Sequence, residues 1–203
     1  MTSVNVSMPQ SGTAHTLAAN ERSVQTGVWL LLAEIVMLFA AFTSAMVVRR
    51  GATNDWVDIV LPAVIRGSQV LLLAGCVCIA LAKRYARKLH QEEAGSRQTV
   101  IYYLSTALLC GLGFLGCQWL GFRHLAMQGI TVASNPAASF LYVFAIAHSV
   151  HLLGGMIALV YVVLRVLQRQ SANGEWLQNV VSAVAIYWYG MTVLWFYILV
   201  VFV

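Results

Sequence analysis

The stretch that decides the fold is residues 26–48, TGVWLLLAEIVMLFAAFTSAMVV, in which Glu34 is the only charged side chain. An α-helix needs about 20 successive apolar residues to cross the hydrocarbon core of a bilayer. Lipid offers no partner to an unpaired backbone N–H or C=O group, so a helix is the expected structure inside that core. We therefore predict that this stretch is a transmembrane helix.

Four further apolar segments follow, at about 60–82, 99–122, 139–164 and 180–203. Of the 203 residues, 60% are hydrophobic and only 9% are charged, and the mean hydropathy is +0.78. A soluble domain carries about 25% charged residues. The sequence thus predicts an all-α integral membrane protein, with one domain over 23–203 that forms a bundle of five transmembrane helices. Residues 1–22 are polar and lack the apolar core of a signal peptide, so we expect a disordered tail there.

The distribution of positive charge predicts how the bundle is oriented. If the amino terminus is inside, the inner segments hold eight of the twelve Lys and Arg residues and the outer segments hold four. This bias favours a cytoplasmic amino terminus and a periplasmic carboxyl terminus. Because the positive charges cluster at the ends of apolar segments, the net charge of +5 indicates membrane orientation and not nucleic-acid binding.

Small residues mark two faces where helices can pack closely. Gly113, Cys117 and Gly121 recur at four-residue spacing in the third segment, and Gly154 and Gly155 lie in the fourth. Small side chains allow two helix backbones to approach each other in lipid. The four cysteines all lie inside apolar segments and form no CxxC pair, so we expect no disulfide and no covalent haem attachment.

Among the polar residues of the apolar segments, one carboxylate and two imidazoles are candidates for a function: Glu34, His148 and His151. For Glu34 two interpretations stay open. The side chain handles protons or contacts a partner, or it is a neutral carboxyl that is hydrogen-bonded within the bundle. His148 and His151 share one helix face, but two ligands on one helix do not make a metal site. Helix rise places Glu34 and His151 at similar depth, so we expect helices one and four to pack, with Glu34 hydrogen-bonded to His151 or His148.

Four short motifs, in order, resemble subunit III of the haem-copper respiratory oxidases in its five-helix bacterial form. They are LAEIVMLF at 32–39, GFLGCQ at 113–118, HSVHLLG at 148–154 and YWYGMTVLW at 187–195. The second and fourth motifs depart from the family pattern. Tyr189 and Thr192 stand where the family has His and Asp, and Gly121 replaces an acidic residue after the glutamine. The chain therefore resembles a divergent member.

The resemblance implies a non-catalytic subunit of a cytochrome c or quinol oxidase in the bacterial inner membrane. It implies that subunits I and II hold the haem and copper, that this chain has no cofactor of its own, and that it holds phospholipid and supports proton uptake and stability. Assembly into a larger respiratory supercomplex is a further expectation. The alternatives are an accessory subunit of a nitric oxide reductase and, less favoured, a small transporter, for which the few intramembrane polar residues offer little of a pathway.

Overall fold

The computed structural model describes residues 11–52, 54–90, 97–168 and 174–202. Its helices are α1 (Ser11–Ala52), α2 (Ala63–Gly67), α3 (Gln69–His90), α4 (Arg97–Met127), α5 (Pro136–Gln168) and α6 (Gly174–Phe202). Five spans are long and apolar enough to cross a membrane, with the short α2 and α3 counted together as one. The described residues contain no strand, so the predicted all-α bundle of five transmembrane helices is confirmed.

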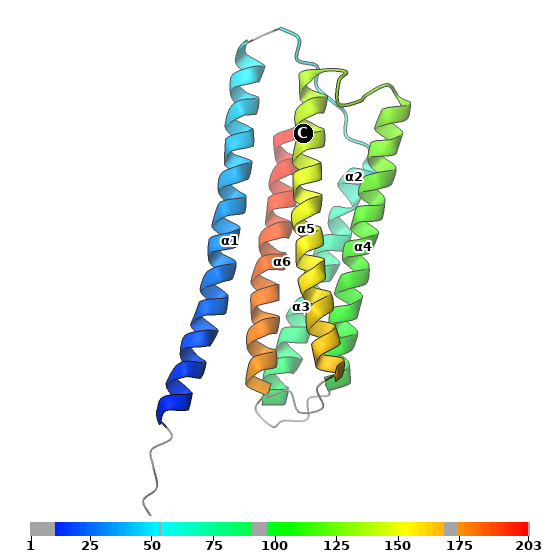
Figure 1. Cartoon of the computed structure of the whole chain (residues 1–203). Helices are drawn as coiled ribbons and strands as arrows, with labels where there is room; N and C mark the ends of the chain where they lie inside the picture. The colour runs from blue at the N-terminus through cyan, green and yellow to red at the C-terminus, as the bar shows by residue number, and fades with distance from the viewer. Residues whose placement is uncertain (1–10, 53, 91–96, 169–173, 203) are drawn as a thin grey trace, which may run out of the picture.

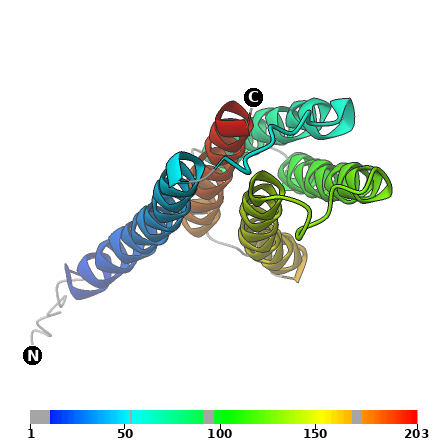
Figure 2. The same ribbon diagram turned by 90° about the horizontal axis from the view of Figure 1, so that it is seen from above.

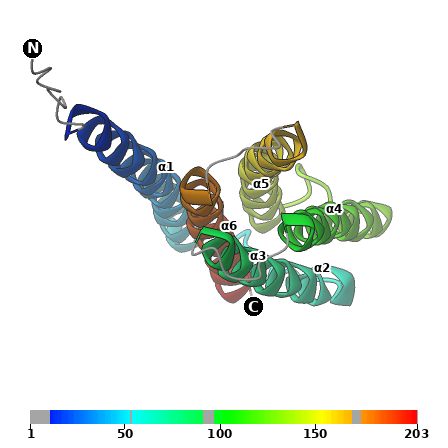
Figure 3. The same ribbon diagram turned by 90° about the horizontal axis from the view of Figure 1, so that it is seen from below.

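The long helices run alternately up and down, so that the start of α1 and the end of α6 lie at opposite ends of the bundle (Figure 1). Helices α3, α4, α5 and α6 form the compact part of the bundle, in which α3 packs on both α4 and α6. Helix α1 packs on α6 and α5 from outside, and its amino-terminal half leans away from the other helices (Figures 2 and 3). This tilt leaves space on both sides of α1.

Helix α1 extends much further toward the amino terminus than the sequence predicted. It begins at Ser11, so residues 11–22 of the expected disordered tail are helical, while residues 1–10 lie outside the described residues. Once a helix has formed, each added residue costs little. Residues 13–26 contain neither Gly nor Pro, and nothing in the sequence therefore stops the transmembrane helix from continuing toward the amino terminus.

The second transmembrane segment is interrupted near its start, which the sequence did not predict. The five-residue α2 follows Pro62, and Ser68 separates it from α3. The Ser68 hydroxyl donates to the Ile65 carbonyl oxygen at 2.6 Å, and the Gln118 side-chain amide donates to Ser68 Oγ at 2.9 Å. Both side chains are buried, so α4 supplies a hydrogen bond to the hydroxyl at the interruption, whereas the side-chain oxygens of Gln69 and Gln118 have no partner among the described residues.

The loop between α4 and α5 is shaped by local hydrogen bonds. Helix α4 ends before Gly129, whose φ of +80° lets the Ile130 N–H reach the Leu125 carbonyl oxygen at 3.0 Å. Asn135 then caps α5, because its side-chain oxygen accepts from the Ala138 N–H at 2.8 Å. Pro136 occupies the first turn of α5, where it has no helical bond to lose.

Candidate functional site

The interior of the bundle holds an unpaired imidazole in an aromatic box. His148 of α5 is fully buried, with its ring 5.7 Å from the ring of Phe114 on α4 and 5.0 Å from that of Trp195 on α6, measured between centroids. Neither nitrogen of His148 has a hydrogen-bond partner within the described part of the chain. The side chain therefore joins three helices by ring packing alone.

His151 lies one turn further along α5, and its hydrogen bonds stay close to its own helix. Its Nδ1–H donates to the Ala147 carbonyl oxygen at 2.7 Å, and its ring is 6.3 Å from that of Phe39 on α1. The hydroxyl of Tyr187 on α6 donates to the His151 backbone carbonyl at 2.6 Å. Tyr187 thus ties α6 to α5 at this level, a contact that the sequence did not reveal.

The first and fourth transmembrane helices, α1 and α5, pack together as predicted. The predicted hydrogen bond from Glu34 to His148 or His151 is wrong. The rings of Phe39 on α1 and Phe144 on α5 lie 5.7 Å apart. The Glu34 side chain, however, is exposed on the outer surface of α1. Across the described ranges it makes no hydrogen bond to His148, which has none, or to His151, which binds its own helix.

The error came from rotation about the helix axis. Each residue advances about 100° around an α-helix. Ile35 and Phe39 are 2% and 1% exposed and face the bundle, so Glu34 points about 100° from the first and about 140° from the second. Similar depth in the membrane was therefore not enough to bring the carboxyl and the imidazoles together.

The small residues singled out in the sequence occupy different environments. A Cβ atom added at Gly121 would collide with Ile65 of α2, and one added at Gly155 would lie 2.5 Å from the Tyr187 ring. At Gly113 the nearest atom, from Leu71, is at an ordinary contact distance of 3.4 Å. Gly154 has no neighbour within 4 Å, and Cys117 is a half-buried free thiol.

Two apolar grooves flank α1. One, of about 650 Å³, lies on the α1–α6 seam and is lined among others by Trp29, Val36, Ala40, Tyr189, Val193 and Tyr197. The other, of about 470 Å³, lies between α1 and the α5–α6 pair and is lined in part by Leu31, His151, Gly154, Gly155, Tyr161 and Tyr187. Most of the residues that line the two grooves are apolar, so the shape and chemistry of the grooves suit hydrocarbon.

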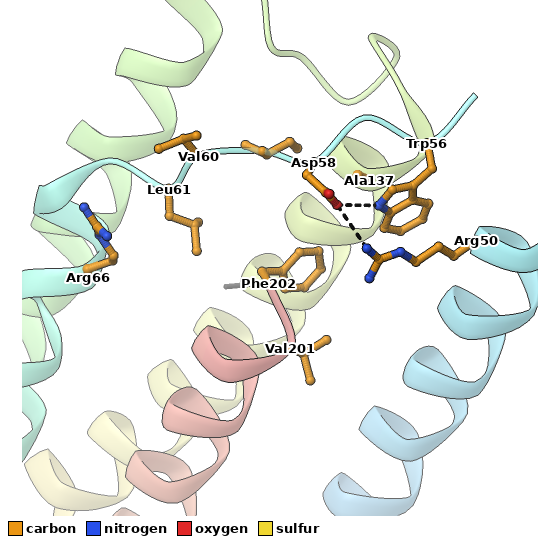
Figure 4. A pocket seen from close by; sticks show the side chains of 10 residues that line it. Arg50, Trp56, Asp58, Val60, Leu61, Arg66, Ala137, Val201 and Phe202 are labelled. Atoms are coloured by element: carbon orange, nitrogen blue, oxygen red, sulfur yellow. Dashed lines mark hydrogen bonds and ion pairs between the residues drawn. The ribbon is translucent and has the colours of Figure 1, made fainter. Parts of the chain in front are cut away.

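A third cavity differs from these grooves because it is lined by charged side chains. It lies at the end of the bundle where α1 and α6 finish, and Arg50, Asp58 and Arg66 contribute to its wall (Figure 4). In the sequence these arginines were counted only among the positive charges of the outer segments. The missed signal was their proximity to Trp56, because Trp and Arg together are typical of the membrane–water interface.

The described side chains do not form a metal-binding cluster. In the ranges that the structure covers, no three His, Cys, Asp or Glu residues come close enough to hold one ion. What the arrangement can do chemically is to pack apolar chains, to present one outward carboxyl at Glu34, and to offer guanidinium groups at one end.

The chain is similar over most of its length to subunits of respiratory oxidases, although no protein-family profile matches it. Quinol oxidase subunit 3 of Bacillus subtilis is 21% identical over 172 residues, covering 85% of this chain and 82% of the relative. Probable cytochrome c oxidase subunit 3 of Nocardia farcinica is 23% identical over 180 residues, covering 87% and 84%. The corresponding protein of Mycobacterium leprae is 24% identical over 179 residues, with the same coverage.

Proposed function

Because this chain belongs to the subunit III family of the haem-copper respiratory oxidases, we propose that it is a non-catalytic subunit of a terminal oxidase. The oxidase reduces O₂ with electrons from cytochrome c or a quinol, and this chain packs beside its catalytic subunit. The similarity to four oxidase subunits over about 85% of the chain carries the proposal. That match is long enough to include most of the five-helix bundle and not one motif alone.

The redox cofactors belong to the partners in this proposal. Subunits I and II hold the haem and copper, and this chain contributes no ligand to them. The chain has five histidines in all, and within the described ranges none of them joins two other His, Cys, Asp or Glu side chains. The same partners place the chain in a larger respiratory complex.

The multi-pass bundle lies in the bacterial inner membrane, with the amino terminus in the cytoplasm and the carboxyl terminus in the periplasm. The bias of eight Lys and Arg residues against four supports this orientation. In that orientation the carboxyl end of α1 and the loop before α2 face the periplasm. The charged cavity at this end then lies at the outer surface of the membrane.

The outward face of α1 that carries Glu34 is a contact with the catalytic subunit. An ionised carboxylate exposed to lipid is costly, so a hydrogen-bonding partner from another chain would stabilise it. Ala41 and Ala45 lie on the same face at seven- and four-residue spacing and are also exposed. Small side chains beside a carboxyl let a second helix approach closely enough to bond it. Support for proton uptake would act through the same carboxyl.

Lipid fills the two grooves that flank α1. Helix α1 touches the rest of the bundle along one stripe of side chains, so the space on either side has to be filled by hydrocarbon. Acyl chains in both grooves would hold α1 at its tilt. This gives the lipid a structural role in keeping the Glu34 face at a fixed angle to the bundle.

The experiment is affinity purification of the tagged chain from its native membrane in mild detergent. We expect a haem-copper catalytic subunit to co-purify, with a haem spectrum that changes on reduction and O₂ consumption by the eluate. Co-purification with a nitric oxide reductase would replace the oxidase by the accessory role in that enzyme. Recovery of the chain without any haem protein would refute the proposal.

A further inference from the structure

The charged cavity at the outer end of the bundle is built from four parts of the chain. It measures about 290 Å³ and is enclosed by the end of α1, the extended stretch 58–61, the start of α2, and the last described turn of α6, with Ala137 of α5 at its edge. Arg50 and Arg66 lie on opposite sides of the α6 end, and Val201 and Phe202 lie between them (Figure 4). Two guanidinium groups thus share one cavity with an apolar floor.

One of the two arginines is fixed in place. An Arg50 N–H donates to Asp58 Oδ1 at 3.3 Å, and its guanidinium carbon lies 5.5 Å from the centre of the Trp56 ring. The Trp56 indole N–H donates to the same Asp58 oxygen at 3.0 Å. Asp58 is the only carboxylate among the described residues of the wall, and Arg50 balances it.

Arg66 provides the charge that is left over. It lies in the last turn of α2, is exposed, and makes no hydrogen bond or ion pair in the part of the chain that the structure describes. The wall therefore carries a formal charge of +1, from two arginines and one aspartate. A guanidinium group matches the geometry of a phosphate and binds it through paired N–H donors.

The α1–α6 groove lies on the same seam as the cavity, and a 2.7 Å hydrogen bond between the Thr43 and Tyr197 hydroxyls crosses the seam where the groove ends. Val201 of the cavity lies one turn beyond Tyr197, which lines the α1–α6 groove. On α1, Ala40 of the groove is followed at heptad spacing by the exposed Val47, one turn from Arg50. From Val201 to Ile186, the deepest groove residue on α6, the axial rise is about 22 Å, more than the roughly 15 Å of one leaflet.

We propose that the Arg50–Arg66 cavity binds the phosphate of an anionic phospholipid of the outer leaflet, whose acyl chain passes over the Thr43–Tyr197 contact toward the α1–α6 groove. This inference rests on the lipid-holding part of the proposed function and names the site and the headgroup charge. A phosphodiester that carries one negative charge balances the wall. A zwitterionic headgroup would instead bring a further cation to a wall whose single carboxylate is already bound to Arg50 and Trp56.

The test measures binding of phosphatidylglycerol to the full chain. The purified chain is placed in phosphatidylcholine nanodiscs that contain increasing phosphatidylglycerol, and native mass spectrometry gives the apparent Kd of the tightest lipid. Arg66→Gln should weaken it about fivefold, the effect of one cationic side chain near a membrane surface. Arg66→Lys, which keeps the charge, should stay within about twofold.

Arg123→Gln is the matched control, because Arg123 is also exposed at the outer end of the bundle but lies on a Trp119 ring outside this cavity. It should leave the tightest site unchanged. Equal losses for Arg66→Gln and Arg123→Gln, or equal affinity for phosphatidylcholine and phosphatidylglycerol, would overturn the proposal. So would displacement of the lipid by inorganic phosphate at millimolar concentration, since the cavity would then be a site for the free anion.

Failure of the lipid site and failure of the oxidase role are separate results. Arg66→Gln should not change co-purification with the haem-copper subunit, because Arg66 makes no bond within the described bundle. If the chain binds phosphatidylglycerol through Arg66 but no haem protein co-purifies with it, the lipid site is supported and the oxidase role is refuted. The converse outcome keeps the oxidase role and removes the lipid site.

Discussion

Two adjacent glycines on α5 should respond oppositely to the same substitution. Gly155 is buried against α6, and a Cβ atom there would lie 2.5 and 2.8 Å from two carbons of the Tyr187 ring. Gly154 is exposed and has nothing within 4 Å. We predict that Gly155→Ala destabilises the bundle and that Gly154→Ala stabilises it.

The magnitudes follow from the contacts. In Gly155→Ala the Tyr187 ring has to move, and overpacking of this kind costs about 1–3 kcal/mol. Movement also breaks the 2.6 Å bond from the Tyr187 hydroxyl to the His151 carbonyl oxygen, worth about 0.5–1.5 kcal/mol. Alanine returns about 1 kcal/mol of helix propensity at either position. The net result is a loss of about 2 kcal/mol for Gly155→Ala and a gain of about 1 kcal/mol for Gly154→Ala.

The assay is unfolding of the purified chain by SDS titration, followed by circular dichroism and by tryptophan fluorescence. Tyr187→Phe is a further control, since it removes the hydroxyl without moving the ring and should cost only about 0.5–1.5 kcal/mol. In a Tyr187→Leu background the Gly155→Ala penalty should largely disappear, because the two changes couple through one contact. If Gly155→Ala is as stable as Gly154→Ala in the original background, the packing argument is refuted.

Substitutions at three other positions probe the polar groups of the membrane-spanning helices. His148→Leu should raise the stability of the isolated chain by about 1 kcal/mol, because it removes a buried imidazole without a described hydrogen-bond partner. A fall in the free energy of unfolding of more than about 1 kcal/mol in SDS titration would contradict this. Gln118→Leu should change the stability by less than about 1 kcal/mol, since the lost hydrogen bond to Ser68 is offset by removal of a buried oxygen without a described partner. Glu34→Leu should leave the isolated chain unchanged but reduce co-purification with the oxidase, and Glu34→Gln should restore most of it; an unchanged yield would remove Glu34 from the interface. Purified alone, the chain should show no stoichiometric Soret band, and such a band would contradict the assignment of haem to partner subunits.

The number of transmembrane helices and their approximate bounds were predictable from hydropathy alone. The span predicted at 99–122 corresponds to α4 (Arg97–Met127), and that at 139–164 to α5 (Pro136–Gln168). The helices continue beyond the predicted bounds because hydropathy marks the hydrocarbon core, whereas a helix can continue with basic and polar residues into the headgroup region. The hydrogen bonds that Gly129 and Asn135 allow at the α4–α5 loop are also local, so residue types of this kind mark a loop without knowledge of the rest of the fold.

The direction in which each side chain points was not predictable, because a membrane helix is apolar on all sides. A soluble helix shows its buried face by contrast with a polar face. On α5 no such contrast distinguishes Gly154 from Gly155, and on α1 it did not reveal that Glu34 turns away from Ile35 and Phe39. The interruption at Ser68 was hidden for a different reason: it depends on a donor from Gln118, which is 50 residues away.

The polar groups of this chain that face outward are the ones for which we propose partners. Inside the bundle, His148 packs between aromatic rings and the Gln118 amide bonds Ser68, while both His148 nitrogens and the Gln118 side-chain oxygen have no hydrogen-bond partner among the described residues. Glu34 and Arg66 face outward and make no bond within the described residues. An ionisable group inside the membrane raises the free energy of a chain on its own, and contact with another molecule can lower it. We propose that Glu34 at membrane depth meets a polar group of a protein partner and that Arg66 at the end of the bundle meets a phosphate, so that one chain presents two surfaces to different partners.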